Sequence, residues 1–498
     1  IDSAVNIIQD GLAMKHYETA PEDRIPFSKK VAYGSGAFVN NLLADSMGRM
    51  VIVLNLGLGM NPALVGLLAA LPRLTDAITD PLMGYISDNT RSKWGRRRPY
   101  IFGGAIAVGI IFALLWQLPD GKSEGFYFWY FLVGSFIFYL AYTIFVTPWV
   151  ALGYELTPDY HERTRLMGVQ NFVGQSVYLM TPYLGAIMAS TVLFDNIVVG
   201  AANVAIVIGV VVVCIGVIPA IFLRERFAQI AAAEHEEKEK ASDGAWAVVV
   251  RNIADFLRGF ATTLKFVPFL KLCVATFLVF NGFILIASFQ TYVIIYYVFA
   301  GDQELGFTWT GHSGVIQSAA TFGVIAFATW LGTKIGKRRA FFVTTGISMF
   351  GYCLKWFCYN PDIPWLMLVP APFMAFGLGG LFTLMPSMIA DVVDMDELNT
   401  NERREGMYGS IFWWVVKLGM AVAIAGGGFL LNATGFDVAL EGNQDDRTIV
   451  LLRLFDAFVP AAASGIAIWA IAAYSITEEK AHETRAELVR RRGTAPAT

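Results

Sequence analysis

The sequence predicts an all-α membrane protein with twelve transmembrane helices in two pseudo-symmetric six-helix bundles. Three observations support this fold class: the composition, a series of long apolar segments, and an internal repeat. Of the 498 residues, 56% are hydrophobic and 15% are charged, whereas soluble domains carry about 25% charged residues. The charges cluster in short segments, and the formal net charge is −3. This pattern indicates a membrane protein and excludes a nucleic-acid-binding one.

Twelve apolar segments are long enough to cross a bilayer, which takes about 20 helical residues. A window of about 19 residues places them at 33–58, 62–86, 99–118, 126–152, 165–190, 197–223, 268–299, 311–334, 340–358, 364–391, 406–432 and 449–475. The runs are continuous and do not alternate with polar residues, which favours helices over transmembrane strands.

The chain repeats itself after about 240 residues. WGRRRPYIFGG at 94–104 resembles IGKRRAFFVTT at 335–345, and acidic and basic residues around 162–165 resemble those at 402–405. Two matches at one offset indicate duplicated halves in the same orientation, which is the arrangement described for the major facilitator superfamily. The expected organisation is an N-terminal segment 1–30, a first bundle 31–223, a linker 224–267, a second bundle 268–475 and a tail 476–498.

Lysine and arginine set the expected orientation. Basic residues follow the second, fourth, eighth and tenth spans, whereas the opposite loops hold mainly Lys122 and Arg447. By the positive-inside rule, both termini and the linker are predicted to be cytoplasmic. The first part of the linker is charged and helix-prone. Its second part has an amphipathic pattern and is expected along the inner membrane surface, and the tail is expected to be a mixed-charge helix.

Asp76 and Asp80 interrupt the apolar run of the second span. Four residues apart, they lie on one face of a helix. A carboxylate near the bilayer centre costs about 2.5–3.5 kcal/mol even on the gentler insertion scales, and two adjacent ones also repel each other. The pair therefore predicts a cation site, which is a metal site if the cation is Na⁺. The alternative is a structural pair that forms a salt bridge to a neighbouring helix.

Lys417 stands in the apolar eleventh span, about a dozen residues after Arg404. At 1.5 Å per residue this is about 18 Å into the membrane, too deep for easy snorkelling to the surface. Asn41, Asp45 and Arg49 follow one another at a spacing of four in the first span. Asp45 and Arg49 either neutralise each other as a structural pair or contribute to a substrate site.

RLTDAITDPLMGYISDNTRSKWGRRRPY resembles the second helix and following loop of the glycoside–pentoside–hexuronide:cation symporters, the melibiose-permease group. Weaker similarities over 31–475 are VAYGSGAFVNN, AYTIFVTPWVAL, ADVVDMDEL and RREGMYGSIFWWVVKLG. The resemblance implies a Na⁺- or H⁺-coupled symporter that moves a small glycoside, sugar or sugar acid by alternating access. Plant sucrose transporters and animal lysolipid transporters have similar signatures, so a non-sugar solute or amphiphile is the alternative, and a non-transporting sensor a further one.

The resemblance also implies site residues. The family's cation site corresponds here to Asp76, Thr79, Asp80 and Thr143, and its charge-balancing lysine to Lys417. Three charged sugar-binding positions of the melibiose branch are replaced by Asn41, Val146 and Asn171, so the resemblance does not define the sugar. The residues expected to bind substrate are Asn41, Asp45, Arg49, Tyr142, Trp149, Asn171 and Trp413.

Charge clusters on the inner face are expected to form gating contacts between the two bundles; they include Arg96, Arg97, Arg163, Asp391, Asp394 and Arg403. No nucleotide-binding motif, nucleophile–base set or metal-ligand spacing indicates an enzyme or a pump. The sequence therefore predicts no cofactor besides the coupling cation. The expected partners are a small solute, a monovalent cation and membrane lipid, for a monomer in the inner (plasma) membrane.

Overall fold

The computed structural model describes residues 21–90, 92–119, 121–157, 160–225, 263, 265–400 and 405–492. Within these ranges the regular structure is helical. The first half contains α2 (Phe27–Met50), α3 (Ile52–Leu56), α4 (Pro62–Ala70), α5 (Asp76–Asn89), α6 (Arg98–Leu115), α7 (Glu124–Glu155), α8 (Tyr160–Gln175), α9 (Leu184–Ala189), α10 (Ile197–Gly216) and α11 (Ile218–Phe222).

The second half contains α14 (Val267–Val293), α15 (Gln303–Ile335), α16 (Lys337–Cys358), α17 (Pro370–Thr400), α18 (Glu405–Ala433) and α19 (Asp446–Ala472), followed by α20 (Glu478–Arg492). A π-helical turn, η6 (Ile294–Val298), continues α14. The helical tail agrees with the sequence prediction. The linker prediction falls mostly on 226–262, which lies outside the described residues.

Nine helices of the described chain are long and apolar enough to cross a membrane. The other three predicted spans are not among these nine, because their helices are too short or too polar. The second span is divided between α4 and α5 by a 3-10 turn that contains Pro72, and the fifth is divided by two 3-10 turns between α8 and α9. The ninth is the continuous helix α16, which begins with three basic residues and contains Lys355.

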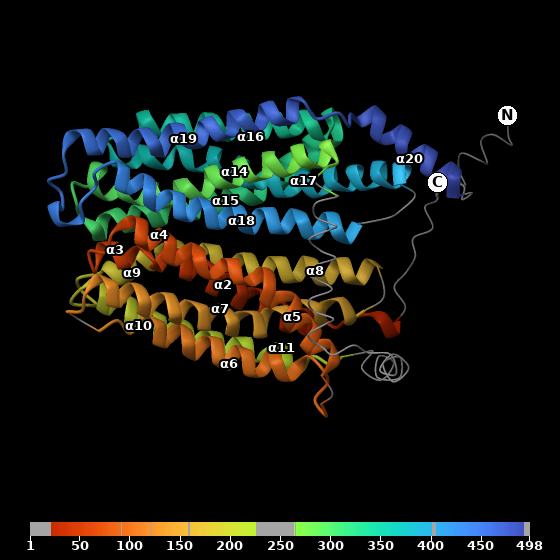
Figure 1. The fold of residues 1–498 in the computed structure, drawn as a ribbon, viewed down its shortest axis with the longest axis horizontal. Helices are drawn as coiled ribbons and strands as arrows, with labels where there is room; N and C mark the ends of the chain where they lie inside the picture. Colours follow the sequence, from red (N-terminus) through yellow and green to blue (C-terminus); the bar gives the residue numbers. More distant parts are fainter. Residues whose placement is uncertain are drawn as a thin grey trace.

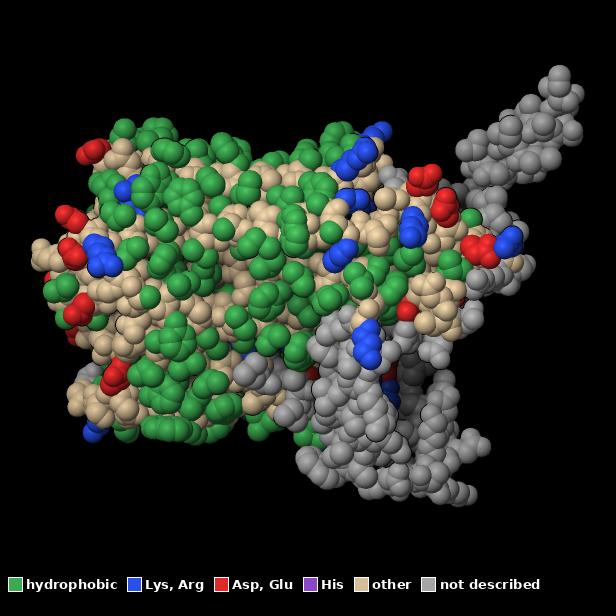
Figure 2. Space-filling model, turned by 45° about the horizontal axis from the view of Figure 1, so that its top comes forward, with side chains coloured by type: hydrophobic (Ala, Val, Ile, Leu, Met, Phe, Trp, Pro, Cys, Tyr) green, Lys and Arg blue, Asp and Glu red, His purple; other side chains and the backbone are tan. Residues whose placement is uncertain are grey.

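The two halves form two layers of roughly parallel helices, red to yellow and green to blue in Figure 1. Within the first layer α6 packs on α7 and α10, and within the second α14 packs on α19. One face of the molecule has apolar side chains along its flank, while charged side chains gather toward the two ends (Figure 2). This distribution is the one expected of a protein whose flank faces lipid.

Helices of the two layers meet at one end of the molecule, which we call the closed end. There α4 packs against α18 and α9 against α15. A buried hydrogen bond joins the layers at this end: the Tyr292 hydroxyl donates to Asn55 Oδ1 at 2.8 Å. The start of α2 and helix α20 lie at the opposite end, which we call the α20 end (Figure 1).

Two glycines make the contact between α4 and α18 possible. A Cβ on Gly428 would lie 2.2 Å from the Pro62 carbonyl oxygen, and one on Gly66 would lie 2.9 Å from that of Ile424. Only residues without a side chain let the two backbones approach this closely, as is common between membrane helices. The closed end therefore depends on backbone contact.

The segment before α2 is fixed to α8 through the buried carboxylate of Glu162, which precedes the predicted fifth span. It accepts hydrogen bonds from the Ile25 amide at 2.9 Å and Arg165 at 3.0 Å, and pairs with Lys30 at 2.6 Å. Burial alone would raise the pKa of Glu162, but the hydrogen bonds from Lys30, Ile25 and Arg165 outweigh it and hold the pKa below its ordinary value.

We expect this carboxylate to make stability depend on pH. Because the folded-state pKa is lowered, the contribution is fully present above the ordinary value of 4.5 and is lost as the pH falls through the lowered pKa. Glu162→Gln should therefore lower the unfolding temperature at neutral pH, and the difference from the unmodified protein should narrow below pH 4.5. Thermal unfolding of both proteins across pH measures this, and an unchanged difference would contradict it.

Candidate functional site

Asp80 lies at the centre of a contact set that joins the two halves. Thr143 of α7 donates its hydroxyl proton to Asp80 Oδ1 at 3.1 Å, and Lys417 of α18 donates to Oδ2 at 2.6 Å. The side chains of Asp80 and Lys417 are 36% and 48% exposed, so solvent ions reach the pair. Asp80 and Lys417 are 337 positions apart in the sequence. In the structure, one oxygen of the Asp80 carboxylate accepts from Thr143 and the other accepts from Lys417.

The local fold explains why Asp80 and the two threonines meet. The 3-10 turn η2 (Leu71–Thr75) breaks the second span, and α5 begins anew at Asp76 and packs against α7. The Thr79 hydroxyl donates to the Thr75 carbonyl at 3.2 Å, and its oxygen lies 3.4 Å from that of Thr143. Either of these two hydroxyls can donate to the other, and the Thr143 hydroxyl also contacts the Asp80 carboxylate. Asp76 opens α5, but its side chain lies outside the described set.

This arrangement suits a small hard cation chemically. Hard cations take oxygen ligands such as carboxylates, hydroxyls and carbonyls. The described contacts supply one carboxylate and two hydroxyl oxygens within one cluster. The ammonium group of Lys417 forms an ion pair with the same carboxylate and neutralises the negative charge that would attract a cation.

A second polar set lies between α2 and α7. Tyr142 donates its hydroxyl proton to Asn40 Oδ1 at 2.6 Å, and Asn40 donates in turn to Asn41 Oδ1 at 3.1 Å. Tyr142 and Asn41 were expected from the sequence, whereas Asn40 was missed. The sequence could have indicated Asn40, because two adjacent amides in an apolar span rarely remain without partners.

The remaining substrate candidates occupy different surroundings. Arg49 pairs with Asp45 at 2.6 Å, as the alternative of a self-neutralised pair requires, and a contribution of either residue to a substrate site stays a prediction. Asn171 is exposed on α8. Trp413 is 55% exposed and stacks on Phe382 with ring centres 6.0 Å apart; it lies one helical turn from Lys417 on the same face of α18.

Trp149 corrects our expectation of a sugar-stacking ring. Its side chain is 2% exposed, its indole nitrogen donates to the Tyr33 carbonyl at 3.0 Å, and its ring stacks on that of Tyr33. A Cβ on Gly36 would overlap the indole. Tyr33 and Gly36 of α2 therefore both contact the indole, and Trp149 is a packing residue between α2 and α7 in this conformation.

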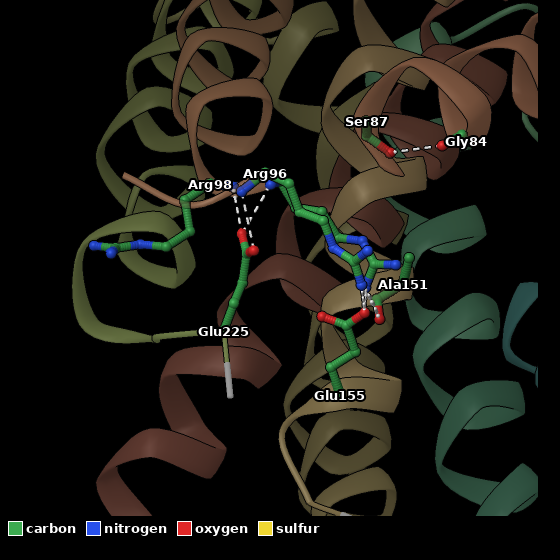
Figure 3. Close-up of polar contacts among 8 residues, drawn as sticks. Gly84, Ser87, Arg96, Arg98, Ala151, Glu155 and Glu225 are labelled. Carbon is green, nitrogen blue, oxygen red and sulfur yellow. Dashed lines mark hydrogen bonds and ion pairs between the residues drawn. The ribbon is translucent and has the colours of Figure 1, made fainter. Parts of the chain in front are cut away.

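The basic residues expected at gates contact acidic residues of their own half. Arg96 and Arg97 pair with Glu155 at the end of α7, while the Glu225 carboxylate accepts hydrogen bonds from the backbone amides of Arg96, Arg97 and Arg98 (Figure 3). A carboxylate at a helix N-terminus is favourable there, because α6 begins at Arg98.

The second half repeats this arrangement. Lys337, at the start of α16, pairs with Asp391 of α17 at 2.8 Å. These described pairs are therefore contacts within each bundle, in contrast to our expectation of contacts between bundles. The side chain of Arg163 and all of Arg403 lie outside the described residues, and Asp394 lies on α17 near Asp391. A gating role for this set stays a prediction about other conformations.

A buried ion pair in the second half was missed altogether. Lys355 of α16 and Asp456 of α19 are 2.5 Å apart, with side chains only 1% and 2% exposed. The Arg453 guanidinium lies 4.0 Å from the Tyr297 ring centre and 4.5 Å from that of Trp356. A lysine and an aspartate within apolar spans indicate that each has a partner, but the sequence does not show that these two spans are neighbours.

Comparison with known proteins identifies a matching family model and several relatives of this chain. The family model described as MFS/sugar transport protein matches residues 40–478. The uncharacterized symporter sll1374 of Synechocystis is 25% identical, over 88% of this chain and 92% of that protein. The glucuronide carrier protein homolog of Escherichia coli is 22% identical, over 93% and 95%.

A solved structure has the same fold. The bacterial homolog to the human lysosomal transporter Spinster, in an inward-facing and unoccupied conformation, aligns with a TM-score of 0.64 and 14% identity over 95% of this chain and 98% of that one. The predicted major facilitator fold is thus confirmed, and the relatives are transporters, not enzymes. The chain belongs to the MFS/sugar transport protein family and is an integral membrane transporter of the glycoside–pentoside–hexuronide:cation symporter type.

Proposed function

We propose that this protein is a cation-coupled secondary symporter that carries a small glycoside, sugar or sugar acid by alternating access. The observation that carries the proposal is the position of Asp80, held by Thr143 in its own half and by Lys417 from the other half. A coupling site has to link ion binding to the relative position of the halves, and a carboxylate shared between them does this directly. The names of the symporter and glucuronide carrier relatives support the same reaction class.

The proposed mechanism follows from the competition for Asp80. With the site free of cation, Lys417 neutralises the carboxylate and ties α18 to α5. An arriving Na⁺ takes oxygen ligands from Asp80, Thr79 and Thr143, with Asp76 as the expected second carboxylate, and releases Lys417. For H⁺, protonation of the carboxylate has the same result. Either cation thus changes the contact between the halves, and coupling is the free energy of that change.

We further propose that the α20 end faces the cytoplasm. The basic residues of the Arg96–Arg98 and Lys337–Arg339 segments lie beside the ends of the last helix of each half: Arg98 donates to the Ala220 carbonyl and Arg338 to that of Ala472. With this orientation the closed end faces outward and the conformation is inward-facing. The halves 31–223 and 268–475, joined by the linker 224–267, are the proposed moving bodies, in the inner membrane.

The test is uptake into proteoliposomes that contain the purified protein. Matched panels of glycosides, sugars and uronic acids are supplied with an inward Na⁺ gradient, an inward H⁺ gradient, or neither, with K⁺ as the control ion. We expect accumulation of at least one solute under one gradient and none without a gradient. Equal uptake in all three conditions would exclude coupling, and no uptake of any panel member would exclude the proposed substrate class.

The orientation predicts what happens when the closed end is disrupted. Gly428→Val should force α4 and α18 apart, because the new side chain overlaps the Pro62 carbonyl. The outward-open population should rise, and a cysteine at Ala63, beside this contact, should react severalfold faster with a membrane-impermeant thiol reagent added outside. Gly323→Val, where a Cβ meets nothing within 4 Å, is the control. A Gly428 variant with unchanged labelling would contradict the proposed closure.

A further inference from the structure

His312 is a titratable side chain at the closed end that the proposed coupling site does not use. It lies on α15 of the second half, and its Nδ1 is 2.8 Å from the hydroxyl oxygen of Tyr183 in η4 (Thr181–Tyr183) of the first half. The neutral imidazole either accepts the hydroxyl proton at Nδ1 or donates its own. Because this hydrogen bond crosses between the halves, separation of the halves at this end breaks it.

The break in the fifth span brings Tyr183 to α15. Two 3-10 turns interrupt the helix there, and Pro182 lies in the second of them. On the facing side, α15 has two glycines: a Cβ on Gly311 would lie 2.6 Å from the Tyr183 ring, and one on Gly314 would lie 2.9 Å from the Pro182 side chain. Only residues without a side chain allow so close an approach, so His312 stands in a tightly packed contact between the halves.

The imidazole of His312 is half-buried between aromatic rings. The ring centres of Tyr183 and Trp309 are each 5.6 Å from that of the imidazole, and both rings stand nearly perpendicular to it. Protonation leaves His312 a donor for Tyr183 but adds a charge. Water hydrates that charge less well in the closed contact than it would after the halves separate. The charged form of His312 therefore favours separation at this end.

Charged groups on the neighbouring elements do not offset this effect. The segments α9 (Leu184–Ala189) and η7 (Pro364–Leu368) have no titratable residue. The charged residues of α14, α16 and α17 lie toward the α20 end, except Lys355, which pairs with Asp456. The nearest carboxylate on α15 toward the closed end is that of Glu304, eight residues before His312 and about 12 Å away along the helix; it accepts a hydrogen bond from Thr191 at 3.0 Å. The other titratable side chains on the elements packed against α15 at this end are tyrosines: Tyr178, Tyr183, Tyr292, Tyr296 and Tyr297.

We propose that His312 is a proton-binding site that controls the closed end and is separate from the coupling site at Asp80. Its protonation shifts the protein from the closed conformation toward one that is open at this end. An unperturbed imidazole ionises at about pH 6.5, within the range that a cell meets. Because the closed end is proposed to face outward, the controlling protons come from outside; this clause rests on the orientation given under the proposed function.

The experiment measures the opening of the closed end directly. Spin labels are attached to Lys122→Cys and Asp362→Cys, which lie in exposed loops of the first and second halves at this end, after the native cysteines are replaced by alanine. Double electron–electron resonance gives the distribution of label distances in buffers without Na⁺ and without solute. We expect the population with the longer distance to rise severalfold from about pH 8 to about pH 5.5, on either side of the ordinary imidazole midpoint.

Three variants, all carrying the labels, assign this response. His312→Gln keeps a hydrogen-bonding group opposite Tyr183 but has no charged form, so its distance distribution should not change with pH. Tyr183→Phe removes the hydrogen bond and should raise the longer-distance population about fivefold at about pH 8, the effect of one net hydrogen bond. Tyr292→Phe is the matched control: it removes the 2.8 Å bond to Asn55 at the same end, so it should open this end at both pH values and keep the response to pH.

A pH response in His312→Gln equal to that of the unmodified protein would place the controlling proton elsewhere, for example at Asp80, and would overturn the proposal. A closed end that tightens at acidic pH, or that does not respond to pH, would overturn it as well, and so would an unchanged population in Tyr183→Phe. These outcomes are independent of the uptake assay. Absence of gradient-driven uptake together with the expected pH response would refute the symporter function and leave the proton site of His312 in place.

Discussion

Replacing Asp80 by asparagine is expected to abolish cation-driven accumulation of substrate while downhill exchange survives. The amide keeps the volume and one oxygen but removes the charge that attracts the cation and that holds Lys417 at 2.6 Å. Coupling is reciprocal, so the substrate affinity of the variant should also stop responding to Na⁺ or pH. Uptake and equilibrium exchange in proteoliposomes across cation concentrations measure both effects.

Two further variants separate charge from structure at this site. Asp195→Asn, in an exposed loop, should behave as the unmodified protein does. Lys417→Met combined with Asp80→Asn should be better tolerated than Asp80→Asn alone, because the lysine no longer stands without its partner. Asp80→Asn with normal ion dependence would show that coupling resides elsewhere and would remove the central claim about this carboxylate.

Replacing Asp456 by leucine is expected to destabilise the protein by about 3–5 kcal/mol, because it leaves the Lys355 ammonium buried without a counter-charge. The pair is almost fully buried between α16 and α19. Replacing both partners, as in Lys355→Met with Asp456→Leu, should restore most of the stability, since apolar residues of similar volume often substitute for a buried pair without loss. Thermal unfolding in detergent measures the three variants.

The Lys337–Asp391 pair provides the matched control. Its side chains are 36% and 21% exposed, so Lys337→Met should cost about 1 kcal/mol or less. A double variant at Lys355 and Asp456 that is no more stable than the single one would show that the pair has a role beyond charge balance. A single variant as stable as the unmodified protein would mean that the ammonium group finds another partner or loses its proton.

The membrane fold was predictable because the thickness of the bilayer fixes the minimum length of a spanning helix, so each span is visible as a long apolar segment. The internal repeat and its basic loops predicted the two halves. The 3-10 turns that interrupt the second span at 71–75 and the fifth span at 176–183 were not predicted, because a segment with a single proline remains apolar along its whole length. Asp80, Thr143 and Lys417 were expected together through family resemblance, and the structure brings them into contact. Their role in coupling stays a prediction.

Contacts between side chains on different helices were the least readable. Trp149 and Tyr142 are both aromatic residues of α7, yet one is enclosed by Tyr33 and Gly36 and the other donates to Asn40. Helical spacing gives the direction of a side chain but not the size of the residue opposite. Lys355 and Asp456 each looked isolated, because the repeat and the motifs say nothing of which spans are neighbours.

The two halves share basic loops at equivalent positions, but the second half has no carboxylate at the positions equivalent to Asp76 and Asp80. At the offset that aligns Trp94 with Ile335, Asp76 and Asp80 correspond to Gln317 and Thr321, and Thr321 donates only to the carbonyl of Gln317 in its own helix. The proposed ion site thus lies in the first copy, and the second copy supplies Lys417, which pairs with Asp80. The two copies are therefore not interchangeable: in a chimera built from two second halves, Lys417 would lose Asp80, the carboxylate with which it pairs in this structure.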